Sequence, residues 1–177
     1  MKKLKREATT PKFVPDFIAQ SVTDVDFAAL KDMGVEYIAF DADSTLVNYR
    51  GKELPRESRD FLRQNRNLFK DWCIASNRVT NDLQPLADSI DAHVIRATLF
   101  TRKPNQRFFT RVVRLFNAEP HKIAMIGDKL IADMFGAKRA GFVTVWVEYI
   151  GRDSAHDRLL RVRKFEKHLM KRYMENE

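Results

Sequence analysis

The stretch V-E-Y-I-A-F-D-A-D-S-T-L, Val35 to Leu46, decides the fold. Its first half is rich in β-branched and aromatic residues, which is typical of a buried strand. The strand ends in Asp41 and Asp43, and residues two apart on a strand point to the same face. In open α/β sheets, ligands bind outside the carboxyl ends of the strands. Two adjacent carboxylates repel unless a cation or a shared proton offsets them, and hard Asp oxygens favour Mg²⁺ as the simpler answer.

The rest of the chain repeats a strand and helix alternation. Further strands are predicted at 69–75, 92–97, 122–126 and 142–147, and helices at 24–33, 55–67, 81–90, 105–117 and 130–138. Strands that alternate with helices at this spacing imply right-handed crossovers. We therefore predict, over residues 24–150, a single Rossmann-like α/β domain with a mostly parallel sheet of about five strands flanked by helices.

Composition limits the classes of protein that remain. The chain has 177 residues, 44% of them hydrophobic and 32% charged, so one soluble globular domain is expected. Cys73 is the single cysteine, which excludes a disulfide within the chain. No segment resembles a signal peptide or a membrane span, so a cytoplasmic location is expected.

The net charge of +8 predicts an anionic partner, which can be a phosphate, a nucleic acid or an anionic lipid surface. Both ends of the chain are basic. Residues 1–23 are predicted to form an N-terminal arm, and residues 151–177 a basic amphipathic helix. Such a helix can lie on an anionic membrane, or pack on and extend its own domain.

Polar side chains also follow the other predicted strands. Ser76 and Asn77 end the second strand, Lys103 lies in T-R-K-P after the third, and Asp128 and Asp133 lie in G-D-K-L-I-A-D after the fourth. Each has an ordinary explanation as a cap or a solvated turn. Together with the first pair they form a set of carboxylates, a hydroxyl and a lysine at one edge of a sheet.

These four segments resemble, in order, the motifs of the haloacid dehalogenase superfamily of phosphotransferases. The motifs read D-A-D-S-T-L, S-N, R-K-P and G-D-K-L-I-A-D-M-F-G-A. The last of them, with P-D-F at 15–17 and T-R-K-P-N-Q-R-F-F, looks most like the YqeG branch. That branch is similar to mitochondrial and bacterial phosphatidylglycerophosphate phosphatases.

The resemblance implies a role for each matching residue. Asp41 would be the nucleophile that forms an aspartyl phosphate, and Asp43 the general acid and then the general base. Mg²⁺ would be held by Asp41, by the main-chain carbonyl of Asp43 and by Asp128.

The remaining motif residues would act on the substrate phosphate. Thr45, Ser76, Asn77 and Lys103 would bind its oxygens, and Lys103 would also stabilise charge in the transition state. Asp133 would support the site by orienting Lys103 or a metal-bound water.

Two positions depart from the family pattern. Ser44 stands where the family usually has Gly or Asn, residues that tolerate a positive φ, so strain is expected if that geometry is kept. Lys129 stands where the YqeG branch usually has Gln, and its side chain would either add a cation near the site or face water.

The segments between the motifs are too short for an inserted cap domain. An uncapped site suits a phosphate carried on something large, and we expect a lipid head group, with removal of phosphate from phosphatidylglycerophosphate by a peripheral enzyme on the inner membrane face. Two alternatives stay open. One is a phosphatase for a sugar, nucleotide or nucleic-acid phosphate, and the other is a non-catalytic nucleic-acid-binding module. The sequence does not indicate an oligomeric state.

Overall fold

The computed structural model describes residues 1–4, 11–80, 82–148 and 162–175. They form a seven-stranded sheet in the order β1-β2-β7-β6-β3-β4-β5, in which all neighbouring pairs are parallel except β1 with β2. The strands are β1 (Lys2–Lys3), β2 (Phe17–Ala19), β3 (Tyr37–Phe40), β4 (Asp71–Ser76), β5 (His93–Arg96), β6 (Ile123–Gly127) and β7 (Val143–Val147). The α/β class and the parallel sheet are confirmed.

The sheet has two strands more than predicted, and both come from the segment predicted as an arm. Phe17 in β2 pairs with Val145 in β7, and Asp16 accepts hydrogen bonds from the backbone N–H and the hydroxyl of Thr144. The prediction of a separate arm was wrong for residues 2–3 and 17–19. Strands of two and three residues leave no periodicity to detect, and the partner of β2 in β7 lies more than a hundred residues away.

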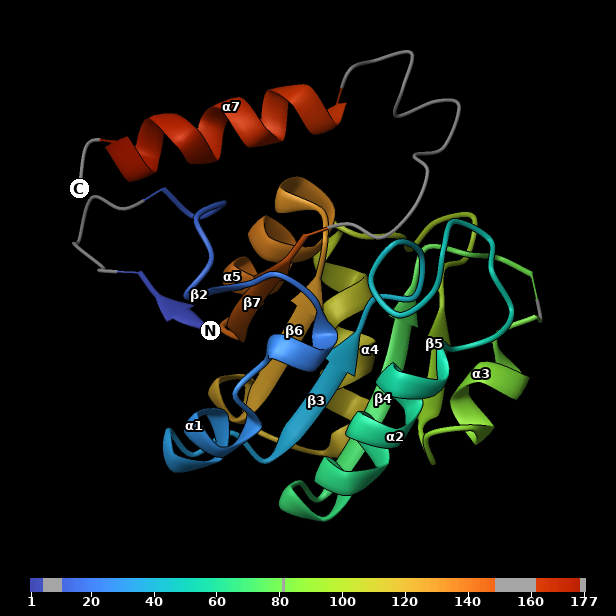
Figure 1. Cartoon of the computed structure of the whole chain (residues 1–177). Coiled ribbons are helices and arrows are strands. Elements are labelled where there is room, and N and C mark those ends of the chain that lie inside the picture. Colours follow the sequence, from blue (N-terminus) through green and yellow to red (C-terminus); the bar gives the residue numbers. More distant parts are fainter. Residues whose placement is uncertain (5–10, 81, 149–161, 176–177) are drawn as a thin grey trace.

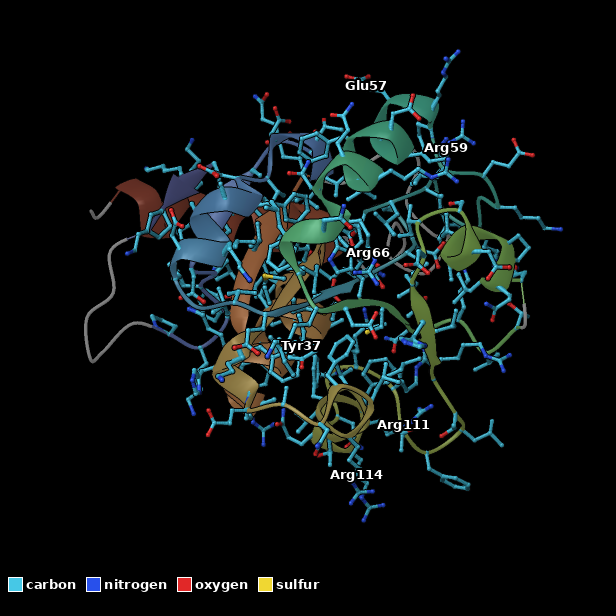
Figure 2. All side chains as sticks on the ribbon, turned by 90° about the horizontal axis from the view of Figure 1, so that it is seen from below. Tyr37, Glu57, Arg59, Arg66, Arg111 and Arg114 are labelled. Atoms are coloured by element: carbon cyan, nitrogen blue, oxygen red, sulfur yellow. The ribbon has the colours of Figure 1, made fainter. Side chains whose placement is uncertain are left out.

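Helices cover both faces of the sheet (Figure 1). One face carries α1 (Phe27–Asp32), α2 (Arg56–Asn65) and α3 (Gln84–Asp88), and the other carries α4 (Gln106–Phe116), η4 (Leu130–Phe135) and α5 (Gly136–Ala140). Short 3₁₀ turns lie at Val22–Asp24, Arg66–Leu68 and Pro120–Lys122. Figure 2 shows α2, with Glu57 and Arg59, on the opposite side of the sheet from α4, with Arg111 and Arg114. The described chain contains no cap domain inserted between these elements.

The central strand explains why the sheet is buried on both faces. Ile38 and Phe40 point into the core beneath α1 and α2, whereas Ala39 between them points into the core beneath α4. An apolar run without polar alternation is what a parallel strand covered on both sides requires. The backbone N–H of Asp41 still donates to the carbonyl of Ile126, so strand pairing holds the chain up to the first carboxylate.

The predicted helix 130–138 divides into two parts. Its first part, η4, is a π-helical turn, in which the N–H of Met134 donates to the carbonyl of Lys129. The second part is the short α5, which ends at Gly141 with φ of 89°. Wide turns of this kind are rare and often occur at functional sites.

The C-terminal helix α7 (Val162–Glu175) packs on the domain. Met170 is buried in the core beneath α4 and α5, and the buried Glu166 accepts from the N–H of Ile131 at 3.4 Å. Of the predicted tail helix over residues 151–177, residues 151–161 and 176–177 lie outside the described residues. Among the described helices, none combines the length and apolar character that crossing a bilayer requires.

Candidate active site

The loops after β3, β4, β5 and β6 meet at one edge of the sheet. Because β6, β3 and β4 are neighbours, the topology brings Asp128, Asp41 and Ser76 together, and Lys103 enters from the loop after β5. These loops surround a cavity of about 560 Å³ that is lined by residues including Asp41, Ser76, Lys103 and Lys129. Sequence and topology therefore agree on where the polar residues gather.

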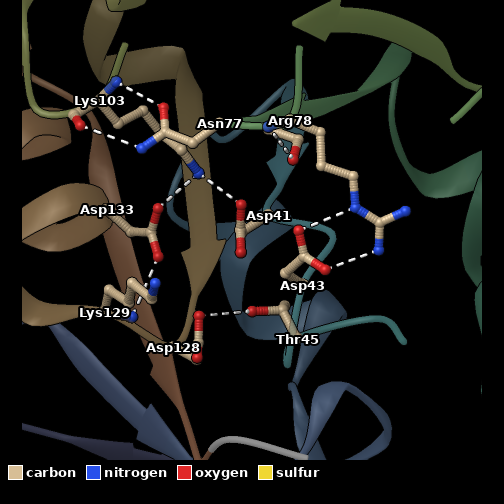
Figure 3. Close-up of polar contacts among 10 residues, drawn as sticks. Asp41, Asp43, Thr45, Asn77, Arg78, Lys103, Asp128, Lys129 and Asp133 are labelled. Carbon is tan, nitrogen blue, oxygen red and sulfur yellow. Dashed lines mark hydrogen bonds and ion pairs between the residues drawn. The ribbon is translucent and has the colours of Figure 1, made fainter. Parts of the chain in front are cut away.

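Lys103 joins two buried carboxylates (Figure 3). Its Nζ donates to Asp41 Oδ1 at 2.7 Å and to Asp133 Oδ1 at 2.6 Å, and its side chain is 1% exposed. Burial raises the pKa of Asp41 to about 6, even though the Lys103 ammonium acts in the opposite direction. Burial alone would lower the pKa of Lys103, but the charges of Asp133 and Asp41 raise it above its ordinary range. Lys103 is therefore a permanent cation at the predicted nucleophile.

Asp128 lies on the other side of Asp41 and is fully buried. Its Oδ1 accepts from the hydroxyl of Thr45 at 3.3 Å, so Thr45 contacts a carboxylate and orients it. Oxygens of Asp41, Asp128 and Asp133 all lie within 4.8 Å of one another. Closely spaced carboxylate oxygens are the hard donors that Mg²⁺ prefers, so these residues fit the expected metal.

Asp43 is held by an arginine that the sequence reasoning missed. Arg78 donates from Nε to Asp43 Oδ2 at 2.8 Å and from Nη2 to Asp43 Oδ1 at 2.6 Å (Figure 3). The same Nη2 also donates to the carbonyl of Gly51 at 3.0 Å, and the N–H of Arg50 donates to Asp43 Oδ1. Arg78 directly follows the S-N motif, so a basic residue at this strand end was the available signal. The pair fixes the Asp43 carboxylate at the side of the cavity.

The S-N pair makes hydrogen bonds to two neighbouring segments of the site. Both amide atoms of Asn77 bind the backbone of Lys103: Oδ1 accepts from its N–H at 2.8 Å and Nδ2 donates to its carbonyl at 3.1 Å. Asn77 therefore positions Lys103, and its predicted contact with the substrate phosphate stays a prediction. The hydroxyl of Ser76 accepts from the N–H of Arg78 at 3.2 Å and lines the cavity.

Two glycines allow Asp133 to reach Lys103. A Cβ on Gly127 would lie 2.5 Å from Asp133 Oδ2, and one on Gly136 would lie 2.4 Å from the ring of Phe109. The first glycine lets Asp133 approach the end of β6, and the second lets α5 approach α4, which begins just after Lys103. The N–H of Lys129 completes the arrangement by donating to Asp133 Oδ2 at 3.0 Å.

The structure also shows how the chain is arranged at the two positions that depart from the family pattern, Ser44 and Lys129. Ser44 has φ of 67°, in the left-handed region, and its N–H donates to the carbonyl of Val47 at 2.7 Å in the tight turn after the first motif. The geometry expected at this position is present, and a serine adopts it. Lys129 is among the residues that line the cavity, and its backbone N–H contacts Asp133 there; whether its side chain adds a cation to the site stays a prediction.

Comparisons with known proteins agree with the fold and the motifs. A family model described as HAD-hydrolase-like matches residues 100–168. Glyceraldehyde 3-phosphate phosphatase of Pyrococcus furiosus is 40% identical over 48 residues, which are 27% of this chain and 20% of that protein. The probable phosphatase YqeG of Bacillus subtilis (strain 168) is 29% identical over 139 residues, 76% of this chain and 77% of that protein. A solved structure from Listeria monocytogenes serotype 4b has a TM-score of 0.54 at 17% identity, over 68% of this chain and 84% of that one.

The chain is therefore similar in sequence to HAD-hydrolase-like proteins over residues 100–168 and to a probable phosphatase over most of its length, and its fold resembles that of the Listeria protein. Its similarity to YqeG runs along most of both chains, in agreement with the branch indicated by the motifs. The chain spans only about a fifth of the length of the glyceraldehyde 3-phosphate phosphatase that it matches.

Proposed function

We propose that this protein is a Mg²⁺-dependent phosphomonoester hydrolase that works through an aspartyl phosphate on Asp41. The observation that supports it most is the position of Asp41. Its carboxylate lines an open cavity, contacts the buried Lys103 ammonium at 2.7 Å, and lies two residues before a second carboxylate. A nucleophile, a cation and a proton carrier at one cavity suit phosphoryl transfer.

In the first step, an Asp41 oxygen attacks the phosphorus of the ester. A bond forms between this oxygen and phosphorus while the bond from phosphorus to the leaving alkoxide breaks, and Asp43 gives the alkoxide its proton. Lys103 offsets the negative charge that gathers on the phosphoryl oxygens. Asp133 and Asn77 hold Lys103 in place for this purpose.

In the second step, water attacks the phosphorus of the aspartyl phosphate. Asp43 takes the proton of the water, the bond from phosphorus to Asp41 breaks, and inorganic phosphate leaves. Arg78 is the positioning residue for Asp43, because it contacts both oxygens of that carboxylate. Asp43 Oδ2 accepts from Arg78 Nε, and the second lone pair of a carboxylate oxygen can carry the proton.

Mg²⁺ would be held by Asp41, the main-chain carbonyl of Asp43 and Asp128. When bound, it would supply a Lewis acid that reduces the repulsion between the phosphate and the carboxylates. Thr45 contributes by orienting Asp128 through its hydroxyl.

We propose phosphatidylglycerophosphate as the substrate, from which the protein would remove the phosphate at the inner face of a membrane. An uncapped site and a net charge of +8 support a phosphate presented on a large anionic carrier. A soluble sugar phosphate is the second candidate, because the similar Pyrococcus furiosus protein is named for glyceraldehyde 3-phosphate. A non-catalytic nucleic-acid-binding module is disfavoured, since it would not need Asp41, Asp43, Lys103 and Asp128 together.

A phosphate-release screen tests this proposal. The full chain is incubated with phosphatidylglycerophosphate in mixed micelles, with sugar phosphates and with nucleotide monophosphates, each with Mg²⁺ and with EDTA. We expect release that requires Mg²⁺ and is fastest with the lipid. Faster release from glyceraldehyde 3-phosphate would select the second candidate, and no release from any monoester would contradict the proposal.

A further inference from the structure

The loop after β5 exposes two consecutive apolar side chains that the proposed chemistry does not use. Leu99 is 89% exposed and Phe100 is 79% exposed, more than any other large hydrophobic residue in the described part of the chain. Single exposed apolar residues are ordinary on protein surfaces, but two adjacent ones at a loop tip are a candidate contact surface.

The turn that carries them is braced from both sides. Thr98 and Thr101 exchange backbone hydrogen bonds at 3.0 and 3.4 Å, and their hydroxyls lie 2.7 Å apart. From α4, Arg111 Nη1 donates to the carbonyl of Arg96 at 2.7 Å and to the Thr101 hydroxyl at 3.3 Å. The turn is therefore closed at its base, and Leu99 and Phe100 project from its tip.

This tip lies close to the mouth of the active-site cavity. The cavity is lined by Arg102, two residues after Phe100, and by the half-exposed Tyr49 and the exposed Val79. Arg50 and Lys129 line the same cavity. All these residues lie on loops at the edge of the sheet toward which the arrows of β3 and β6 point in Figure 1. The mouth therefore combines apolar side chains with several cations.

We propose that the Leu99–Phe100 tip inserts into the interface of an anionic lipid bilayer and holds the cavity mouth against the head groups. This proposal rests on the proposed phosphatase function, because the bilayer is the surface that would present the substrate phosphate to the cavity. An apolar tip beside cations matches a bilayer, in which the side chains enter the acyl boundary and the cations meet lipid phosphates.

A protein partner fits this surface less well. A stable protein interface buries roughly 800 Å² on each partner, which is far more than two side chains at one loop tip can offer. A nucleic acid would use an aromatic platform for its bases, but Leu99, the more exposed of the two residues, has no ring to stack. Charge complementarity with an anionic surface remains, since the chain carries a net charge of +8.

The test is co-sedimentation of the full chain with vesicles of phosphatidylcholine, with and without phosphatidylglycerol. The variant is Leu99→Ser with Phe100→Ser. The matched control is Met33→Ser with Leu115→Ser, two exposed apolar residues at the ends of α1 and α4, at the opposite edge of the sheet. We expect the wild type and the control to bind the phosphatidylglycerol vesicles. The tip variant should bind them roughly ten-fold or more weakly, because it loses two apolar side chains from the interface.

Hydrolysis of a water-soluble phosphomonoester by the same preparations separates the two proposals. The tip variant should keep this activity, which also shows that it is folded. Equal vesicle binding by the tip variant and the wild type would overturn the docking proposal, as would a wild type that binds neither vesicle. Loss of self-association in the variant, with vesicle binding unchanged, would overturn it in favour of a second copy of the chain. If no preparation hydrolyses the monoester, the phosphatase proposal fails while vesicle binding still decides the docking surface.

Discussion

Replacing Lys103 with Met tests whether the buried ammonium holds the site together electrostatically. In the wild type, Lys103 Nζ lies 2.7 Å from Asp41 Oδ1 and 2.6 Å from Asp133 Oδ1. The exposed fractions of the Lys103, Asp41 and Asp133 side chains are 1%, 8% and 1%, so solvent only weakly screens the charges that the lost cation leaves behind. Met fills similar space without charge and leaves two carboxylates facing each other in the interior.

The expected loss in the free energy of unfolding is about 3–5 kcal/mol, the usual cost of leaving a buried charge uncompensated. A second change, Asp133→Asn, should act with opposite signs in the two backgrounds. In the wild type it removes a charged partner of Lys103 and costs about 1–3 kcal/mol. In the Lys103→Met background it removes one of the two unpaired carboxylates, and we expect it to restore about 1–3 kcal/mol.

The assay is urea unfolding near neutral pH in EDTA, because a bound metal would mask the carboxylates. Lys70→Met is the matched control: its Nζ lies 2.6 Å from Glu36 Oε2, as close as Lys103 is to Asp133, but its side chain is 60% exposed. We expect this control to unfold close to the wild type. If Asp133→Asn destabilises both backgrounds equally, the electrostatic argument is refuted.

Three further changes probe other parts of the site. Gly127→Ala places a Cβ 2.5 Å from Asp133 Oδ2, so kcat should fall about 10²-fold; wild-type kcat would show that Asp133 is not held this tightly. Arg78→Met frees the Asp43 carboxylate and should lower kcat about 10²-fold with little change in KM, with partial recovery in Arg78→Lys; a change confined to KM would contradict the positioning role. Ser44→Gly relieves a φ of 67° and should raise the free energy of unfolding by about 0.5–1 kcal/mol in urea titrations; a loss would mean that the serine is not strained.

The meeting of Asp41, Ser76, Lys103 and Asp128 could be predicted from the sequence for a topological reason. Each residue follows a strand of a parallel sheet, and the carboxyl ends of parallel strands share one edge. The helix boundaries could also be predicted from the sequence where capping residues are present. The predicted 105–117 agrees with α4 because the side chain of Asn105 caps its start and Asn117 ends it in a left-handed conformation.

The parts that escaped prediction depend on contacts between distant segments. Arg78 contacts Asp43 only because the loop after β3 folds back toward the end of β4. No local sequence pattern predicts this contact. Asn77 could be placed at the correct strand end, but its hydrogen bonds to Lys103 depend on the path of a loop 26 residues away. Strand β2 also escaped prediction, because its pairing with β7 joins segments from the two ends of the domain.

Trapping the covalent intermediate tests the central claim most directly. The full chain turns over a phosphomonoester with Mg²⁺, is quenched and reduced with borohydride, and is digested for mass spectrometry, since reduction converts an aspartyl phosphate to homoserine. The account predicts homoserine at position 41 in the wild type and in the control Asp82→Asn, a carboxyl that also lines the cavity. In Asp41→Asn the modification should be absent and turnover should fall by roughly 10⁴-fold or more. Retained turnover in Asp41→Asn, or a modification at another residue, would contradict the account.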